Sequence, residues 1–394
     1  MGGLPRQKTI INSMKQVYAA NQLLLINTGN LTKPSIKRDY ELNRRQTSII
    51  TRVYQQMGCD VLTPGFQELI DGRMIIAALV KAAGTMPLVC SNLQDGKKMG
   101  IKPYVVLQKG GKSILVASLM DPRVEKKAIH GINIKDPVAS LKKILAAVPH
   151  DLAITVLHFS DRKARKIISK VPGIDLAILA TQRGIMATPE AAGKSYLVKN
   201  NNHGKTINYL DWDFASRKPI KDGSLKVSKE DVKPEPELAK QIDDYETWLR
   251  NYYISLEKIE EESGTSEPQA STYVGFQTCA QCHPEIVADW KTTRHAQAYA
   301  SLQKKCKDYC PDCLPCHVTG KKNPLNGVGF LSPKKTPNLF NVQCEQCHGS
   351  AHQHVKTPKK PYGTTITQDT CIVCLTGQSD PEFSFDNDIN LINH

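Results

Sequence analysis

Short apolar runs alternate with amphipathic stretches through the first half of the chain. Gln22–Asn27 is one such run, and it stops at Gly29, as strands buried in a parallel sheet commonly do. Gly110-Gly111 lies between two further runs and predicts a hairpin turn. The predicted strands are residues 22–27, 60–63, 87–91, 104–108, 113–119, 152–158, 176–180, 195–198 and 206–211, and the predicted helices are residues 42–57, 67–82, 141–148 and 162–171. This alternation predicts an α/β domain of mixed sheets flanked by helices.

The pattern changes in the middle of the chain. Residues 218–236 are rich in Lys, Pro and Asp and predict a loop, whereas residues 238–262 have apolar positions at helical spacing and a strongly acidic end. Residues 263–271 read Ser-Gly-Thr-Ser-Glu-Pro-Gln-Ala-Ser, a composition typical of a flexible linker. The predicted divisions are a first domain over residues 1–235, an acidic helix and linker over 236–270, and a second domain over 271–394.

Charge is distributed unevenly between these segments. Residues 1–235 contain 37 Lys and Arg against 19 Asp and Glu, whereas residues 236–270 contain 3 against 9. A basic domain can bind nucleic acid, but no interleaved aromatic residues or nucleic-acid motif accompany this charge. We therefore interpret it as a solvated surface and expect no nucleic-acid partner. No apolar run reaches the 18 residues of a transmembrane helix.

The twelve cysteines are concentrated in the second domain. Cys59 and Cys90 stand alone in the first 270 residues, and the other ten lie between Cys279 and Cys374. Three copies of Cys-x-x-Cys-His account for six of them. These copies are Cys279-Ala-Gln-Cys282-His283, Cys313-Leu-Pro-Cys316-His317 and Cys344-Glu-Gln-Cys347-His348.

This motif has the spacing that covalent haem attachment needs. Two thiols three residues apart on a helical turn can both bond to one porphyrin, and the next residue then supplies the proximal iron ligand. Zinc sites and redox dithiols also use Cys-x-x-Cys, but they do not require a histidine directly after the second cysteine. We predict three c-type haems, with His283, His317 and His348 as proximal ligands.

Each iron has a sixth coordination position. A second histidine there gives a low-spin electron-transfer centre, whereas an open position permits ligand chemistry. The remaining histidines of the domain are the candidate distal ligands, and we expect at least two of them to bind iron. They are His295, His352, His354 and His394.

Four cysteines lie outside the three motifs. Cys371-Ile-Val-Cys374 is followed by Leu375, which cannot bind iron, so a disulfide is favoured over a haem with a different axial ligand. Cys306 and Cys310 can pair with each other or remain free.

The second domain resembles the tetrahaem cytochrome c-554 family over about 120 residues. The matching stretches are Cys279–His283 with Trp290 and His295-Ala296-x-Ala298, Cys313–Gly320, Cys344–Gly349 with His354-Val355, Ser379–Phe385 and Ile392-x-His394. The resemblance implies closely packed haems, with two histidines at most of the irons. His295 and His354 occupy positions where the family places distal ligands, and His394 matches less closely. Leu375 departs from the family pattern, which puts a fourth haem in doubt.

The first domain resembles the metallophosphatase domain of the 5'-nucleotidase family. The similar stretches are Gly2-Gly3-Leu4 with Arg6, Leu24–Asn30, Met57–Leu69, Leu157-His158-Phe159, Gly173–Leu176 and His203-Gly204-Lys205. The resemblance implies a site for two divalent metals that orient phosphate and activate water.

The ligand motifs of that family are largely replaced in this chain. The replacements are Gly29-Asn30 for Gly-Asp, Gly65-Phe66-Gln67-Glu68 for Gly-Asn-His-Glu, and Ala180-Thr181-Gln182-Arg183 for Gly-His-x-His. His158 alone matches a ligand position, and the first Asp-x-His motif of the family would precede Gly2. One ligand cannot hold two cations, so we expect no divalent metal and an inactive phosphatase domain.

These observations predict an exported multihaem cytochrome that exchanges electrons with donor and acceptor proteins. Haem attachment takes place after export, so the expected location is periplasmic or extracellular. The opening residues lack the regions of a signal peptide, and we therefore expect a longer precursor with a signal peptide. The alternatives are a haem oxidoreductase for a small nitrogen or oxygen compound and an active phosphoesterase with a redox accessory. No catalytic residue is assigned.

Overall fold

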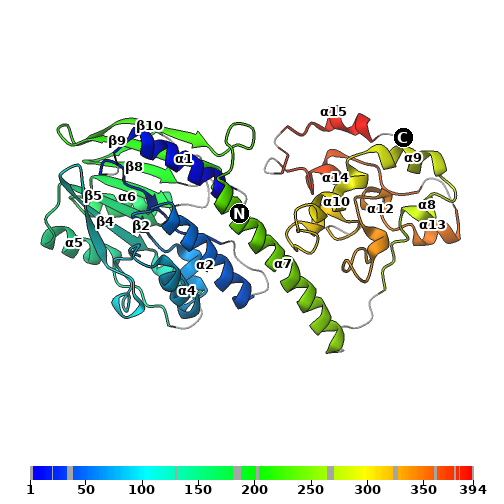
Figure 1. Cartoon of the computed structure of the whole chain (residues 1–394), viewed down its shortest axis with the longest axis horizontal. Coiled ribbons are helices and arrows are strands. Elements are labelled where there is room, and N and C mark those ends of the chain that lie inside the picture. Colours follow the sequence, from blue (N-terminus) through cyan, green and yellow to red (C-terminus); the bar gives the residue numbers. More distant parts are fainter. Residues whose placement is uncertain are drawn as a thin grey trace. The chain divides into compact units, whose positions relative to one another are not determined.

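The computed structural model divides into two compact units, residues 1–239 and 240–394 (Figure 1). It describes residues 3–19, 21–32, 39–128, 131–180, 188–200, 204–263, 270–322, 327–358, 362–376, 379–380 and 382–392. Of the helices in these ranges, none is both long and apolar enough to cross a membrane.

A six-stranded mixed sheet forms the centre of the first unit. Its strand order is β3-β4-β5-β6-β8-β7, with parallel pairing from β4 to β8 and antiparallel pairing at both edges. The strands are β3 (Tyr104–Lys109), β4 (Lys112–Met120), β5 (Leu152–His158), β6 (Leu176–Ala180), β7 (Glu190–Ala192) and β8 (Ser195–Asn200). Gly110 and Gly111 both have positive φ, 55° and 74°, and form the tight turn between β3 and β4. The predicted hairpin is confirmed.

Both faces of this sheet are buried, because its central strands carry apolar side chains at successive positions. On one face Leu119 and Leu157 pack with Leu141 of α5 (Pro137–Ala147) and Ile167 of α6 (Asp161–Lys170). On the other face Val116 and Ile154 pack with Val61 and Val89. Val61 belongs to a small second sheet, in which β1 (Ile26–Asn27) pairs in parallel with β2 (Val61–Leu62).

Four helices complete the first unit. They are α1 (Leu4–Val17), α2 (Tyr40–Gln56), α3 (Phe66–Ile70) and α4 (Arg73–Ala83). Helices α2 and α4 lie side by side (Figure 1). Leu69, Ile76 and Leu79 from this group are buried in a common core with Leu62 of the small sheet. Mixed sheets flanked by helices are therefore confirmed.

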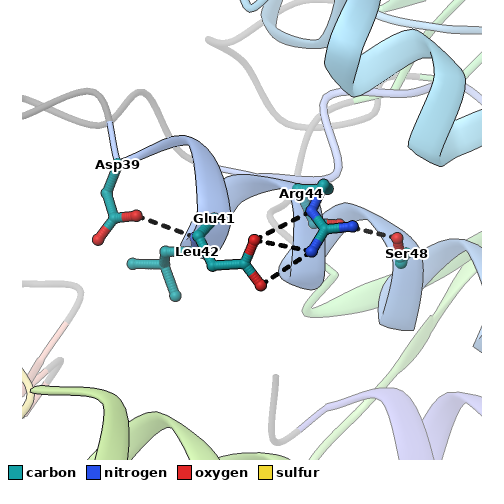
Figure 2. A network of polar contacts seen from close by, with 5 residues as sticks. All are labelled: Asp39, Glu41, Leu42, Arg44 and Ser48. Carbon is teal, nitrogen blue, oxygen red and sulfur yellow. Dashed lines mark hydrogen bonds and ion pairs between the residues drawn. The ribbon is translucent and has the colours of Figure 1, made fainter. Parts of the chain in front are cut away.

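Polar contacts at the start of α2 explain why the helix begins there (Figure 2). The carboxylate of Asp39 accepts a hydrogen bond from the backbone N–H of Leu42 at 3.0 Å and so caps the helix. Glu41 pairs with Arg44 through the Nη2–Oε2 contact of 2.7 Å. The Ser48 hydroxyl donates to the carbonyl of Arg44 at 2.8 Å.

Several predicted elements need correction. The single helix predicted over residues 67–82 is two helices, because Gly72 has a φ of 80° that a continuing helix cannot adopt. The loop predicted over residues 218–236 begins with a strand, β10 (Lys218–Lys226), which pairs antiparallel with β9 (Thr206–Asp213). Its Lys, Pro and Asp side chains are tolerated because every position of β10 is exposed or half-buried.

Two other predicted strands are shorter than expected. The strand over residues 22–27 is reduced to β1, and the one over residues 87–91 makes only single bridges, Leu62 with Leu88 and Val89 with Lys102. Helix α1 had no predicted counterpart.

The second unit consists of short helices joined by loops. They are α8 (Phe276–Cys279), α9 (Pro284–Thr292), α10 (Ala298–Gln303), α11 (Leu314–His317), α12 (Cys344–His348), α13 (His352–Lys356), α14 (Gln368–Ile372) and α15 (Phe385–Asp388), with 3-10 turns at His295–Gln297, Pro337–Leu339 and Ile389–Leu391. This matches the predicted helical, loop-rich domain.

The acidic helix α7 (Pro236–Glu262) is continuous, and from residue 240 onward it belongs to the second unit. Arg250 Nε lies 2.8 Å from Oδ1 of the buried Asp308, and Arg250 Nη2 lies 3.0 Å from Oδ2. Lys307 pairs with Glu246 at 3.4 Å. These ion pairs attach α7 to the second unit, whereas the sequence analysis had predicted a separate segment of acidic helix and linker.

Candidate haem-binding site

Each of the three Cys-x-x-Cys-His motifs forms a single helical turn in the second unit. The first covers the end of α8 and the turn after it, and the other two lie on α11 and α12. The backbone N–H of Cys282 donates to the carbonyl of Cys279 at 3.2 Å, and that of Cys316 donates to Cys313 at 3.2 Å. Such turns bring two thiols to one side of the backbone, which fits thioether attachment of one porphyrin to each motif.

Glu345, between the two cysteines of the third motif, is only 1% exposed. Its carboxylate accepts hydrogen bonds from the backbone N–H groups of Val274 at 3.0 Å, Gly275 at 2.8 Å and Ala351 at 2.8 Å. Val274 and Gly275 lead directly into the first motif. The buried carboxylate therefore joins the first motif to the third through charge-assisted hydrogen bonds.

Two glutamines extend this network: Gln343 adds a second bond to the segment before the first motif, and Gln346 reaches the second motif. Gln343 Oε1 accepts from the backbone N–H of Phe276 at 2.7 Å, and Gln346 Oε1 accepts from that of Gly320 at 2.8 Å. Gly320 closely follows the second motif. We refer to Gln343, Glu345 and Gln346 together as the polar clamp, since they hold all three motifs in one cluster.

His317 is oriented for iron binding by a hydrogen bond on the far side of its ring. Its Nδ1 lies 2.7 Å from the carbonyl oxygen of Ala298. A carbonyl only accepts hydrogen bonds, so Nδ1 carries the proton and Nε2 keeps a free lone pair. Proximal histidine ligands need this tautomer, and the second shell commonly fixes it in this way.

The rings of His283 and His354 lie near each other and are nearly parallel. Their centres are 6.5 Å apart, and their planes differ by 15°. Both side chains would therefore be available to hold the iron of one haem, which would supply one-electron chemistry there.

The other candidate distal ligands differ in their surroundings. His295 is half-buried, and its burial lowers the pKa of its imidazole, which favours the neutral form that binds metals. His352 is exposed at the start of α13. His394 lies outside the described residues.

The cysteines outside the motifs are free thiols, so the favoured disulfide between Cys371 and Cys374 is not formed in this structure. Burial and the nearby thiol of Cys316 raise the pKa of Cys374 to about 12. Cys306 and Cys310 form no disulfide either, and the nearby thiol of Cys313 lowers the pKa of Cys310 to about 7. The thiols of this unit thus lie close to one another across motif boundaries.

In the first unit, residues that stand in place of metal ligands are hydrogen-bonded to the backbone. The carboxylate of Glu68 accepts from the backbone N–H groups of Gly65 at 2.7 Å, Asn30 at 2.9 Å and Leu31 at 2.7 Å, and burial raises its pKa. Asn30 Oδ1 accepts from the N–H of Gln67 at 3.2 Å. These oxygens are engaged by the backbone, so the residues do not fit a pair of divalent cations.

His158 is isolated from other metal-binding side chains. Its Nε2 lies 3.5 Å from the hydroxyl of Thr63, and its buried Nδ1 has no hydrogen-bond partner within the described ranges. The same ranges contain no group of three or more His, Cys, Asp and Glu arranged to bind a metal. Thr181, Gln182, Arg183 and His203, from the other family motifs, lie outside those ranges.

The burial of His158 predicts a pH dependence of stability. Burial lowers its pKa from 6.5 to about 4, so below pH 6.5 the unfolded chain binds a proton that the folded chain does not. Stability is complete above about pH 6.5 and should fall by about 3 kcal/mol as the pH drops through about 4. Urea unfolding of His158→Leu between pH 4 and 7 should show a weaker dependence than wild type. His150→Leu is the control and should retain the wild-type slope; equal slopes for all three proteins would contradict the prediction.

Two different architectures are joined in this chain. The first unit has a layered α/β fold, and the second consists of helices and loops that contain the three Cys-x-x-Cys-His turns. Residues 278–349 match the family model described as cytochrome c554 and c-prime.

Two solved structures are similar to this chain in fold. Sulfate thiohydrolase SoxB of Thermus thermophilus, in complex with glycerol, has 15% identity and a TM-score of 0.51, covering 61% of this chain and 45% of its own. A putative 5'-nucleotidase from Staphylococcus aureus, in complex with alpha-ketoglutarate, has 14% identity and a TM-score of 0.50, covering 85% of this chain and 66% of its own. This chain therefore spans about half of the SoxB chain, and the likeness concerns the fold alone. A search of curated protein sequences finds no match.

Proposed function

We propose that this protein is an exported electron carrier with three covalently bound c-type haems. The observation that carries the proposal is the polar clamp, which gathers three Cys-x-x-Cys-His turns into one compact unit. Closely spaced haems exchange electrons with one another, whereas isolated attachment sites would not. A bound haem supplies an iron that takes up and releases one electron.

The residues of the chain have distinct roles in this proposal. The six motif cysteines anchor the porphyrins, and His283, His317 and His348 are the proximal ligands. His354 is the distal ligand of the first haem, as its distance from His283 supports. His295 remains a candidate for a second iron.

The intact mass of the exported protein tests the number of haems. Produced in a host with cytochrome maturation, the chain should carry three haem masses, and its absorption spectrum should show a Soret band. A colourless protein with the mass of the polypeptide alone would overturn the proposal. A fourth haem mass would show that Cys371 and Cys374 also bind haem.

We further propose that the first unit has no phosphatase activity of its own. The backbone bonds to Asn30 and Glu68 support this, because they occupy the oxygens that a cation would need. The purified protein should contain no stoichiometric divalent metal, and added Mn²⁺ or Zn²⁺ should not produce phosphatase activity. Metal analysis combined with a nucleotide hydrolysis assay checks this, and metal-dependent turnover above that of a heat-denatured sample would contradict it.

The location and partners follow from the haem chemistry. Export to the periplasm or the cell exterior is required for attachment, and electron transfer requires a donor and an acceptor protein. Nucleic acid is not among the proposed partners, despite the net charge of +14.

A further inference from the structure

Residues 362–364 form a strap over the third haem motif. The hydroxyl of Tyr362 donates to the carbonyl of Gly349 at 2.5 Å, and the hydroxyl of Thr364 donates to the carbonyl of Cys347 at 3.0 Å. These two carbonyls belong to the residues on either side of His348. The strap is therefore fixed to the backbone both before and after this proximal ligand.

The middle residue of the strap packs directly on His348. Gly363 has a φ of +86°, and a side-chain carbon at this position would lie 2.9 Å from Cβ of His348 and 3.0 Å from its Nδ1. Any residue larger than glycine would displace the imidazole. The close approach leaves the strap little freedom to move.

The aromatic ring of Tyr362 contacts histidines of two different haem sites. It is stacked on His354, with ring centres 4.4 Å apart and planes 20° from parallel. Its centre also lies 6.3 Å from that of His348. His354 in turn faces His283 at 6.5 Å. The Tyr362 ring therefore lies close both to His354, a candidate ligand of the first iron, and to His348, the candidate ligand of the third iron.

We propose that Tyr362 is a positioning residue that sets the ring orientation of His354 at the first haem and links it mechanically to the third motif. The proposal rests on the proposed haem-binding function. His354 lies on a helix of only five residues, α13, which by itself restrains a side chain weakly. The stacked ring, anchored at Gly349, supplies the missing restraint.

The test compares variants of the full-length mature protein by electron paramagnetic resonance and by redox titration. Tyr362→Ala should keep its full haem mass but change the low-spin signal of one haem. The population with His354 detached should rise about three- to tenfold, the range expected for loss of one aromatic contact. The midpoint potential of that haem should shift with it. Tyr362→Phe keeps the stacked ring but loses the anchor at Gly349, so its signal should change less than that of Tyr362→Ala.

Reference variants separate this proposal from the proposed function. His354→Ala should abolish the same low-spin signal completely, and Tyr40→Ala, a half-exposed tyrosine of the first unit, should change nothing. A haem-free wild type would refute the proposed function itself, and His354→Ala with an intact low-spin signal would refute His354 as a ligand of the first haem. With those two results as expected, a wild-type spectrum for Tyr362→Ala overturns the role of Tyr362 alone.

A second variant covers a failure of Tyr362→Ala to mature. Tyr362→Leu fills much of the same volume without a flat ring, so it should carry all haems and show the same altered signal. A wild-type signal for Tyr362→Leu would overturn the proposal. Loss of haem by Tyr362→Leu as well would also overturn it, because Tyr362 would then be needed for haem attachment and not for the orientation of His354.

Discussion

Replacing both Cys344 and Cys347 with serine should remove one haem and destabilise the whole second unit. Thioether attachment needs both thiols, so the intact mass should fall by one haem and the Soret absorbance by about one third. The third motif also contains the centre of the polar clamp, so an empty motif exposes the apolar surface that a porphyrin would cover. The thermal midpoint of this unit should therefore fall, and its loops should become sensitive to protease.

The matched control uses the other cysteine pair of the same spacing. Cys371→Ser with Cys374→Ser should leave three haem masses and the wild-type thermal midpoint, because Leu375 offers no proximal ligand. If the variant with Cys344→Ser and Cys347→Ser retained all of its haem, the proposal of three haems would be wrong. Loss of one haem by the control would instead assign a haem to Cys371 and Cys374.

Replacing Glu345 with alanine should prevent the second unit from folding stably. The carboxylate serves three backbone N–H groups, and each donor left buried without an acceptor costs about 1–3 kcal/mol. The total of about 3–9 kcal/mol is comparable to the whole stability of a typical domain. We expect little or no mature cytochrome from this variant, measured as haem absorbance per milligram of exported protein.

Two further substitutions make the Glu345 prediction specific. Glu345→Gln keeps one acceptor oxygen and should give an intermediate yield, whereas the exposed Glu285→Ala, in the first turn of α9, should stay within about 0.5 kcal/mol of wild type. If Glu345→Ala matured as well as Glu285→Ala, the polar clamp would not be what holds the motifs together.

The sequence predicted the elements whose residue pattern is imposed by burial along the element itself. It missed elements and breaks that leave no such pattern. Apolar runs at β4, β5 and β6 predicted buried strands, because both faces of a covered sheet demand apolar side chains. Strand β10 was missed, since an exposed ribbon places no such demand on its residues. The break at Gly72 was missed because glycine is permitted within a helix as well as at its end.

The haem motifs were predictable from the sequence because attachment involves residues within five positions of one another, and a helical turn alone brings them together. The polar clamp and the strap had no sequence signal. A glutamate between two cysteines, or a tyrosine in a loop, looks the same whether buried or solvated, and only the approach of distant segments determines which it is. The residue pattern likewise supplied four candidate distal histidines, and only the family resemblance favoured His295 and His354 among them. The separation of His283 and His354 depends on how α13 packs beside the first motif, and that packing is a property of the folded unit as a whole.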